Sequence, residues 1–174
     1  MLVDWFGREL FKSFCRPAEA VTDFRTFVSG VTAQHLARAP DFRSVQARVC
    51  ALLMGKTLVG HGLKNDLDAL LLHHDLHSRR DTAHYPPLMR KNAFGALRSQ
   101  KLKKLVADHL GAEIQVAGAA HDPAEDARAA LAVYKLFRTQ WERDEADRSR
   151  RHKNRGGKKK APRAAGASAG AGAY

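Results

Sequence analysis

The sequence predicts an α/β fold in which a sheet is covered by helices. Short apolar runs alternate along the chain with segments whose apolar residues recur every three or four positions, as strands alternate with helices. Runs 2–6 and 9–15, separated by Gly7-Arg8, predict an antiparallel β-hairpin at the start. Residues 57–60 predict a short buried strand, and 79–82 predict another.

Helix boundaries are marked by capping residues. Thr32 is a suitable N-cap for a short helix, and Asp41 is one for the longer helix that Gly55 ends. Leucines at helical spacing after Gly62 predict a helix over 63–71. Residues 99–110 predict a further helix, closed by Gly111.

The last helix has the clearest start. Asp122 is the expected N-cap, Pro123 occupies the first helical position and Glu125 the third, an Asp form of the capping box. An apolar stripe runs from there to Trp141 and stops beyond Glu142. We therefore predict one domain over 1–147 and a basic, Gly/Ala-rich, disordered tail over 148–174.

Charge is unevenly distributed along the 174 residues. Nine of the Lys and Arg residues and no acid lie in 148–163, which leaves +3 of the net charge of +12 for the other residues. Such a run attracts phosphate backbones, so Lys158, Lys159 and Lys160 are candidate nucleic-acid contacts. The length of the run favours nucleic-acid contact or nuclear targeting, and a solvated, disordered end that aids solubility is the alternative. No apolar run is long enough to predict a membrane span, and the two cysteines predict reduced core thiols in an intracellular protein.

Two acids and a histidine stand near helix starts. Asp66 falls in the first turn after the 57–60 strand, and Asp126 falls in the first turn of the last helix, five residues after His121. Each acid alone is explained by the partial positive charge of a helix N-terminus. Their combination, Gly-His then Asn-Asp and later His-x-x-x-x-Asp, is more specific. The histidines at positions 73, 74, 77 and 84 have no carboxylate at useful spacing and are expected in surface loops.

Longer stretches carry the same arrangement. They are Val21-Thr-Asp-Phe-Arg-Thr-Phe-Val-Ser-Gly30, Gly55-Lys-Thr-Leu-Val-Gly-His61, Lys64-Asn-Asp-Leu67, Arg80-Asp-Thr82 and His121-Asp-Pro-Ala-Glu-Asp-Ala-Arg128. On these motifs residues 2–142 resemble the DEDDh 3′–5′ exonucleases, in the RNA exonuclease 4 and interferon-stimulated exonuclease branch. The resemblance implies a ribonuclease H-like mixed sheet flanked by helices.

The resemblance also implies a mechanism and roles. Two Mg²⁺ or Mn²⁺ ions would assist hydrolysis of the terminal phosphodiester of RNA, with single-stranded DNA as an alternative substrate. Asp66 and Asp126 would be metal ligands, His121 the general base, and Arg25 and Thr26 neighbours of the 3′-terminal nucleotide. Asp81 is expected to bond nearby backbone instead. Ribosomal RNA processing, a nuclear and nucleolar location and a monomeric state are the accompanying expectations.

One family motif is missing from the chain. The Asp-x-Glu of the first strand should precede Leu2, and the first 60 residues contain none. Asp4 matches the following strand, so it does not substitute. Three interpretations follow: an exonuclease domain without its first strand and inactive as given, a catalytically dead relative that binds RNA or a ribosome-assembly complex, or an unrelated α/β domain with a basic tail.

Overall fold

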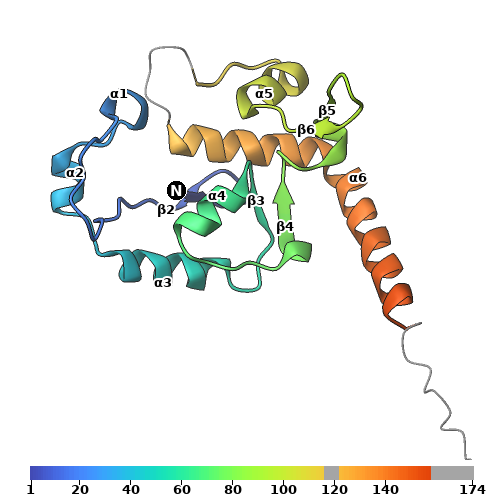
Figure 1. The fold of residues 1–174 in the computed structure, drawn as a ribbon, viewed down its shortest axis with the longest axis horizontal. Coiled ribbons are helices and arrows are strands. Elements are labelled where there is room, and N and C mark those ends of the chain that lie inside the picture. Colours follow the sequence, from blue (N-terminus) through green and yellow to red (C-terminus); the bar gives the residue numbers. More distant parts are fainter. Residues whose placement is uncertain (116–121, 158–174) are drawn as a thin grey trace, which may run out of the picture. The chain divides into compact units, whose positions relative to one another are not determined.

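The computed structural model describes residues 1–115 and 122–157, drawn as ribbon in Figure 1. The chain divides into two compact units, residues 1–138 and 139–174. The predicted site residues that the structure describes all lie in the first unit. Within the described residues no helix is long and apolar enough to cross a membrane.

Three pairs of strands make up the sheets. The predicted hairpin is present as β1 (Leu2–Val3) and β2 (Glu9–Phe11), which pair antiparallel with Leu2 opposite Phe11. Strands β3 (Leu58–Gly60) and β4 (Arg79–Asp81) pair in parallel, with Leu58 opposite Arg79. A second hairpin, β5 (Arg90–Lys91) and β6 (Leu97–Arg98), was not predicted. The mixed α/β architecture is confirmed, but the described strands form three two-stranded sheets and not one continuous sheet.

Helices follow the predicted caps closely. The Asp41 carboxylate accepts a hydrogen bond from Ser44 N at 2.9 Å, and Asp122 Oδ1 accepts one from Ala124 N at 2.9 Å. Gly111 ends its helix with φ 63°, the left-handed conformation that favours glycine. The helices are α1 (Thr26–Ser29), α2 (Ala33–Ala37), α3 (Phe42–Leu53), α4 (Leu63–Ala69), α5 (Leu102–Leu110) and α6 (Pro123–Gly157), with 3₁₀ turns η1 (Leu76–Ser78) and η2 (Pro86–Leu88).

The core of the first unit packs around the start of α6. Val133 of α6 and Leu105 of α5 are fully buried, and Leu88 is almost so. Phe137 makes edge contacts with the rings of Tyr85 and His109, which tie α6 to η2 and α5. Figure 1 shows α5 on one side of this part of α6 and β3, β4 and α4 on the other. A second cluster, Leu58, Leu63 and Leu67, joins β3 to α4.

Two expectations differ from the structure. Helix α6 continues to Gly157, so residues 148–157 of the expected tail are helical. Five of these ten residues are Arg or Lys, which are good helix formers without an apolar stripe, and the Arg148–Glu145 ion pair at 2.7 Å adds support. Both cysteines are free, but neither is a core residue, because Cys15 is half-buried and Cys50 is exposed.

Candidate active site

A cleft of about 570 Å³ brings the two predicted acids together. Asp66 of α4 and Asp126 of α6 both line it, although they are 60 residues apart in the sequence. Leu2 of β1 lines the same cleft, as does the whole of β3. Within the described part of the chain, β1 pairs only with β2 and β3 only with β4. The cleft therefore lies along strands that each have one unpaired edge.

Asp66 is held at the cleft by the first turn of α4. Asp66 is exposed to solvent, but the residues that line the cleft around it remove part of the water from its carboxyl group. This partial desolvation raises the pKa of the Asp66 carboxyl, the positive charge of the Met1 amino group opposes the rise, and the Asp81 carboxylate adds to it. A carboxyl in such a setting gains from a nearby cation.

Asp126 is oriented by Gln115, a contact that the sequence did not predict. Gln115 Nε2 donates a hydrogen bond to Asp126 Oδ1 at 2.7 Å. Gln115 has φ 56°, an uncommon conformation for a residue other than glycine, and its side chain also lines the cleft. The amide holds one carboxylate oxygen in place, as a second-sphere group does for a ligand.

His61 is a third polar group in the cleft. It follows β3 and is half-buried, with Nδ1 2.9 Å from Thr82 Oγ1. Burial lowers the pKa of the imidazole, while the charges of Asp81 and Asp126 partly oppose the change. His61 is therefore mainly neutral at pH 7. The sequence pattern showed it as the end of a strand and assigned it no role.

Asp81 has the structural role that was predicted for it. Its carboxylate accepts hydrogen bonds from Gly62 N at 2.8 Å, Leu63 N at 3.0 Å and Ala83 N at 3.0 Å. It thereby caps α4 from the neighbouring strand, because Gly62 has no side chain to do so. His84 Nδ1 lies 3.0 Å from Asp81 Oδ2, so the expectation that His84 has no carboxylate partner is wrong.

The remaining predicted site residues are not in the cleft or not described. Arg25 precedes α1 with an exposed side chain 4.0 Å from Asp23, and Thr26 Oγ1 donates to Val31 O at 2.7 Å. Neither lines the cleft. His121 and Lys158, Lys159 and Lys160 lie outside the described residues, so their roles stay predictions.

The cleft has the right donors for a hard divalent cation but too few of them. Carboxylate oxygens are the preferred ligands of Mg²⁺ and Mn²⁺, and Asp66 and Asp126 supply two such groups. Among residues 1–115 and 122–157 no three His, Cys, Asp or Glu side chains gather closely enough to hold a metal ion. Two carboxylates alone would not complete the coordination of such an ion, so further ligands would have to come from elsewhere.

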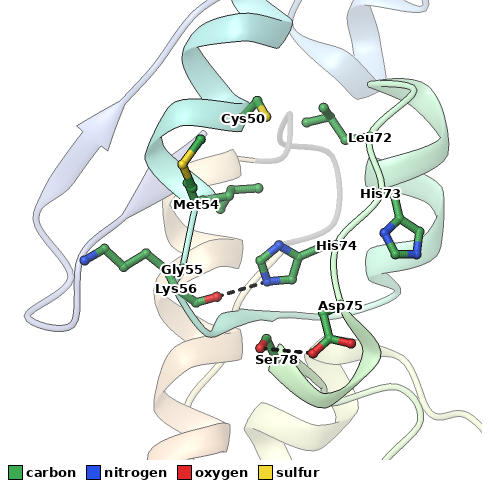
Figure 2. A pocket seen from close by; sticks show the side chains of 10 residues that line it. Cys50, Met54, Gly55, Lys56, Leu72, His73, His74, Asp75 and Ser78 are labelled. Carbon is green, nitrogen blue, oxygen red and sulfur yellow. Dashed lines mark hydrogen bonds between the residues drawn. The ribbon is translucent and has the colours of Figure 1, made fainter.

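A second cavity, of about 320 Å³, lies apart from these acids (Figure 2). It is formed where α3 ends and by residues 72–78, and His74 Nε2 is 3.0 Å from Lys56 O. Asp75 and Ser78 bond each other at 3.4 Å across its lower wall. His74, Asp75 and Ser78 thus bond neighbouring groups, and none of the predicted site residues lines this cavity.

Comparison with known proteins identifies relatives of this chain. The model of the family described as "Exonuclease" matches residues 4–134. RNA exonuclease 4 of Mycosarcoma maydis is 43% identical over 159 residues, which are 90% of this chain and 40% of that protein. The apoptosis-enhancing nuclease of Homo sapiens is 36% identical over 145 residues, 83% of this chain and 45% of that protein. The chain spans about half, or less, of the length of these relatives.

Solved structures show the same fold. The pseudoubiquitin hydrolase–RNA exonuclease module of Saccharomyces cerevisiae Pan2, in complex with A7 RNA, matches with a TM-score of 0.63 and 26% identity. The match covers 90% of this chain and 26% of that one. The Neurospora crassa Pan2 catalytic unit matches with a TM-score of 0.65, 23% identity and coverage of 89% and 25%. With the family model covering most of the chain, this protein belongs to the exonuclease family.

Proposed function

We propose that this chain forms the larger part of a metal-dependent 3′–5′ exoribonuclease domain. The observation that carries the proposal is that Asp66 and Asp126 line one cleft together with β3 and Leu2 of β1, strands that each pair with a single neighbour in the described part of the chain. RNA is the substrate we favour, since relatives are named RNA exonuclease 4, and single-stranded DNA is the alternative.

Asp66 and Asp126 would supply oxygen ligands for divalent cations, Mg²⁺ or Mn²⁺. Such ions stabilise charge on phosphoryl oxygens and lower the pKa of bound water. The chain's own groups prepare the ligands: Asp81 fixes the start of α4 that bears Asp66, and Gln115 orients Asp126. An extended segment bearing Asp-x-Glu beside β1 and β3 would complete the ligand set. His121 keeps its proposed role as general base.

The proposal is tested in a protein with an Asp-x-Glu strand fused ahead of Met1. Single-stranded RNA labelled at its 5′ end should shorten by single nucleotides from the 3′ end. Asp66→Asn and Asp126→Asn should abolish this activity, and His121→Ala should lower it about 10²- to 10⁴-fold. Asp68→Asn, which removes an exposed acid two residues from Asp66, is the matched control. Equal activity in Asp126→Asn and Asp68→Asn would reject the proposal.

A catalytically inactive RNA-binding relative is the second candidate. It is favoured by the shortage of ligands among the described residues and by the Gln115 amide already bonded to Asp126. In that case the fused strand would confer no hydrolysis, while RNA binding would remain.

A nuclear and nucleolar location, and action on ribosomal RNA, are part of the first proposal, and imaging of the tagged protein tests the location.

A further inference from the structure

We propose that the β5–β6 hairpin is a single-stranded nucleic-acid binding arm, in which Phe94 stacks on a base and the surrounding cations hold phosphates. The choice of nucleic acid as the ligand rests on the proposed function. The hairpin spans residues 90–98, between η2 and α5, and no sequence pattern singled it out. Figure 1 shows it beside α5 with its turn extending outward.

The first observation is the exposure of Phe94. Its side chain is 95% exposed, the highest value among the large apolar residues of the described chain. A phenylalanine contributes nothing to folding from such a position, whereas base–aromatic stacking uses an exposed ring directly.

The second observation is that hydrogen bonds fix the turn that carries Phe94. Asn92 Oδ1 accepts hydrogen bonds from Phe94 N at 3.0 Å and Ala96 N at 2.9 Å. Gly95 adopts φ 78° and donates its N–H to Asn92 O at 2.9 Å. Four backbone and side-chain bonds around Asn92, including Asn92 N to Ala96 O at 2.9 Å, give this short loop a defined shape.

The third observation is the charge around the ring. Residues 82–107 contain six Lys or Arg and no Asp or Glu. Lys104 pairs with Asp108 at 2.8 Å, but the other five have no ion pair within the described parts of the chain. A flexible polymer of phosphates has the complementary charge. These five cations are Arg90, Lys91, Arg98, Lys101 and Lys103.

The fourth observation is continuity with the cleft. Lys101 lines the cleft together with Asp66 and Asp126. Arg98, at the end of β6, is three residues from Lys101, a span of at most about 11 Å. Gln100 Nε2 donates to Leu88 O at 3.0 Å and anchors the base of the hairpin to the buried core. A strand bound at the cleft can therefore continue along this basic edge.

Phe6 provides a matched comparison within the same chain. It also stands at a hairpin turn, is 75% exposed and lies 5.2 Å from the guanidinium of Arg8. That guanidinium is bonded to Asp4 at 2.7 Å, so its charge is neutralised locally. The two rings share exposure and differ in the free positive charge around them.

The test is binding of a fluorescent single-stranded RNA 12-mer to the full chain, measured by anisotropy in EDTA. Phe94→Ala should weaken binding roughly 5- to 100-fold, Phe94→Trp should retain it, and Phe6→Ala should leave it unchanged. An abasic 12-mer should not distinguish Phe94→Ala from wild type. Replacing Arg90, Lys91 and Arg98 by Ala should reduce the slope of log K against log salt by about 2, or about 0.7 for each phosphate that these side chains bind.

Two results would overturn the hairpin proposal: unchanged binding in Phe94→Ala, or equal weakening for base-containing and abasic oligonucleotides. Cleavage by the strand-fused protein separates this outcome from failure of the exonuclease proposal. If the strand-fused protein cleaves RNA and Phe94→Ala binds RNA as tightly as wild type, only the hairpin proposal is rejected. If the strand-fused protein does not cleave RNA but Phe94→Ala weakens RNA binding, the exonuclease proposal is rejected and the hairpin proposal stands.

Discussion

Asp81 caps α4 through Gly62, with the Asp81 Oδ1 atom 2.8 Å from the Gly62 amide nitrogen. The carboxylate comes from β4, the strand parallel to the one that leads into Gly62. A long-range contact thus performs what is usually a local function, and it fixes the helix turn that presents Asp66.

Asp81→Ala should lower the free energy of unfolding by about 2–4 kcal/mol. Loss of a cap costs up to about 2 kcal/mol, and donors left without an acceptor in a largely buried place add to this. Urea denaturation followed by circular dichroism measures the change. Asp68→Ala, which removes an exposed partner of Lys64, should stay within about 0.5 kcal/mol. Equal effects of the two variants would show that the cap contributes nothing.

Gly60→Ala should destabilise the junction between β3 and α4. A Cβ atom at Gly60 would lie too close to Leu63 Cδ2, and Leu63 is buried in the β3–α4 cluster. Overpacking of this kind costs about 1–3 kcal/mol. The double variant with Leu63→Ala should be more stable than the sum of the two single effects predicts, since the clash is then absent. Strict additivity in denaturation experiments would contradict the contact.

Asp66→Asn should make stability less dependent on pH. The pKa of Asp66 is raised above 3.8 in the fold, so the folded state binds the proton more tightly than the unfolded chain does. The stability that this gives is complete below pH 3.8 and diminishes as pH rises through the folded-state pKa. The melting temperature of Asp66→Asn should therefore be equal to or above that of wild type at about pH 7, with no gain at about pH 3. The effect is small because the side chain reaches solvent. A lower melting temperature at neutral pH would contradict it.

Deleting residues 148–174 should weaken RNA binding and its dependence on salt. The nine Lys and Arg residues of 148–163 would attract phosphates without reading bases. The slope of log K against log salt should fall by about 0.7 for each phosphate that the shortened chain no longer binds, with base preference unchanged. Titrations at several salt concentrations measure both. An unchanged slope would leave only a role in solubility or localisation.

Features set by neighbouring residues could be predicted from the sequence. Asp41 and Asp122 cap their helices as expected, because an N-cap needs only its own side chain and the next turn. The hairpin at Gly7 is also set by neighbouring residues, because its turn needs a glycine, and Gly7 adopts φ 80° there. Family motifs then singled out Asp66 and Asp126, whose spacing alone would not have joined them.

Features that depend on distant partners could not be predicted. Gln115 carries no motif, and its bond to Asp126 exists only in the folded chain. The β5–β6 hairpin is exposed on both strands, so no alternation of apolar residues marks it. Helix α6 outlasts its apolar stripe because helix propensity suffices where packing no longer decides.

The most direct test of the account compares hydrolysis of single-stranded RNA by residues 1–174 alone and with an Asp-x-Glu strand fused ahead of Met1. Asp66 and Asp126 alone are too few ligands, so the unfused chain should release no measurable nucleotides with Mg²⁺ or Mn²⁺. The fused protein should gain activity, and a fusion with Ala-x-Ala in place of the acids should not. Processive nucleotide release by 1–174 itself, abolished by Asp126→Asn, would contradict the account.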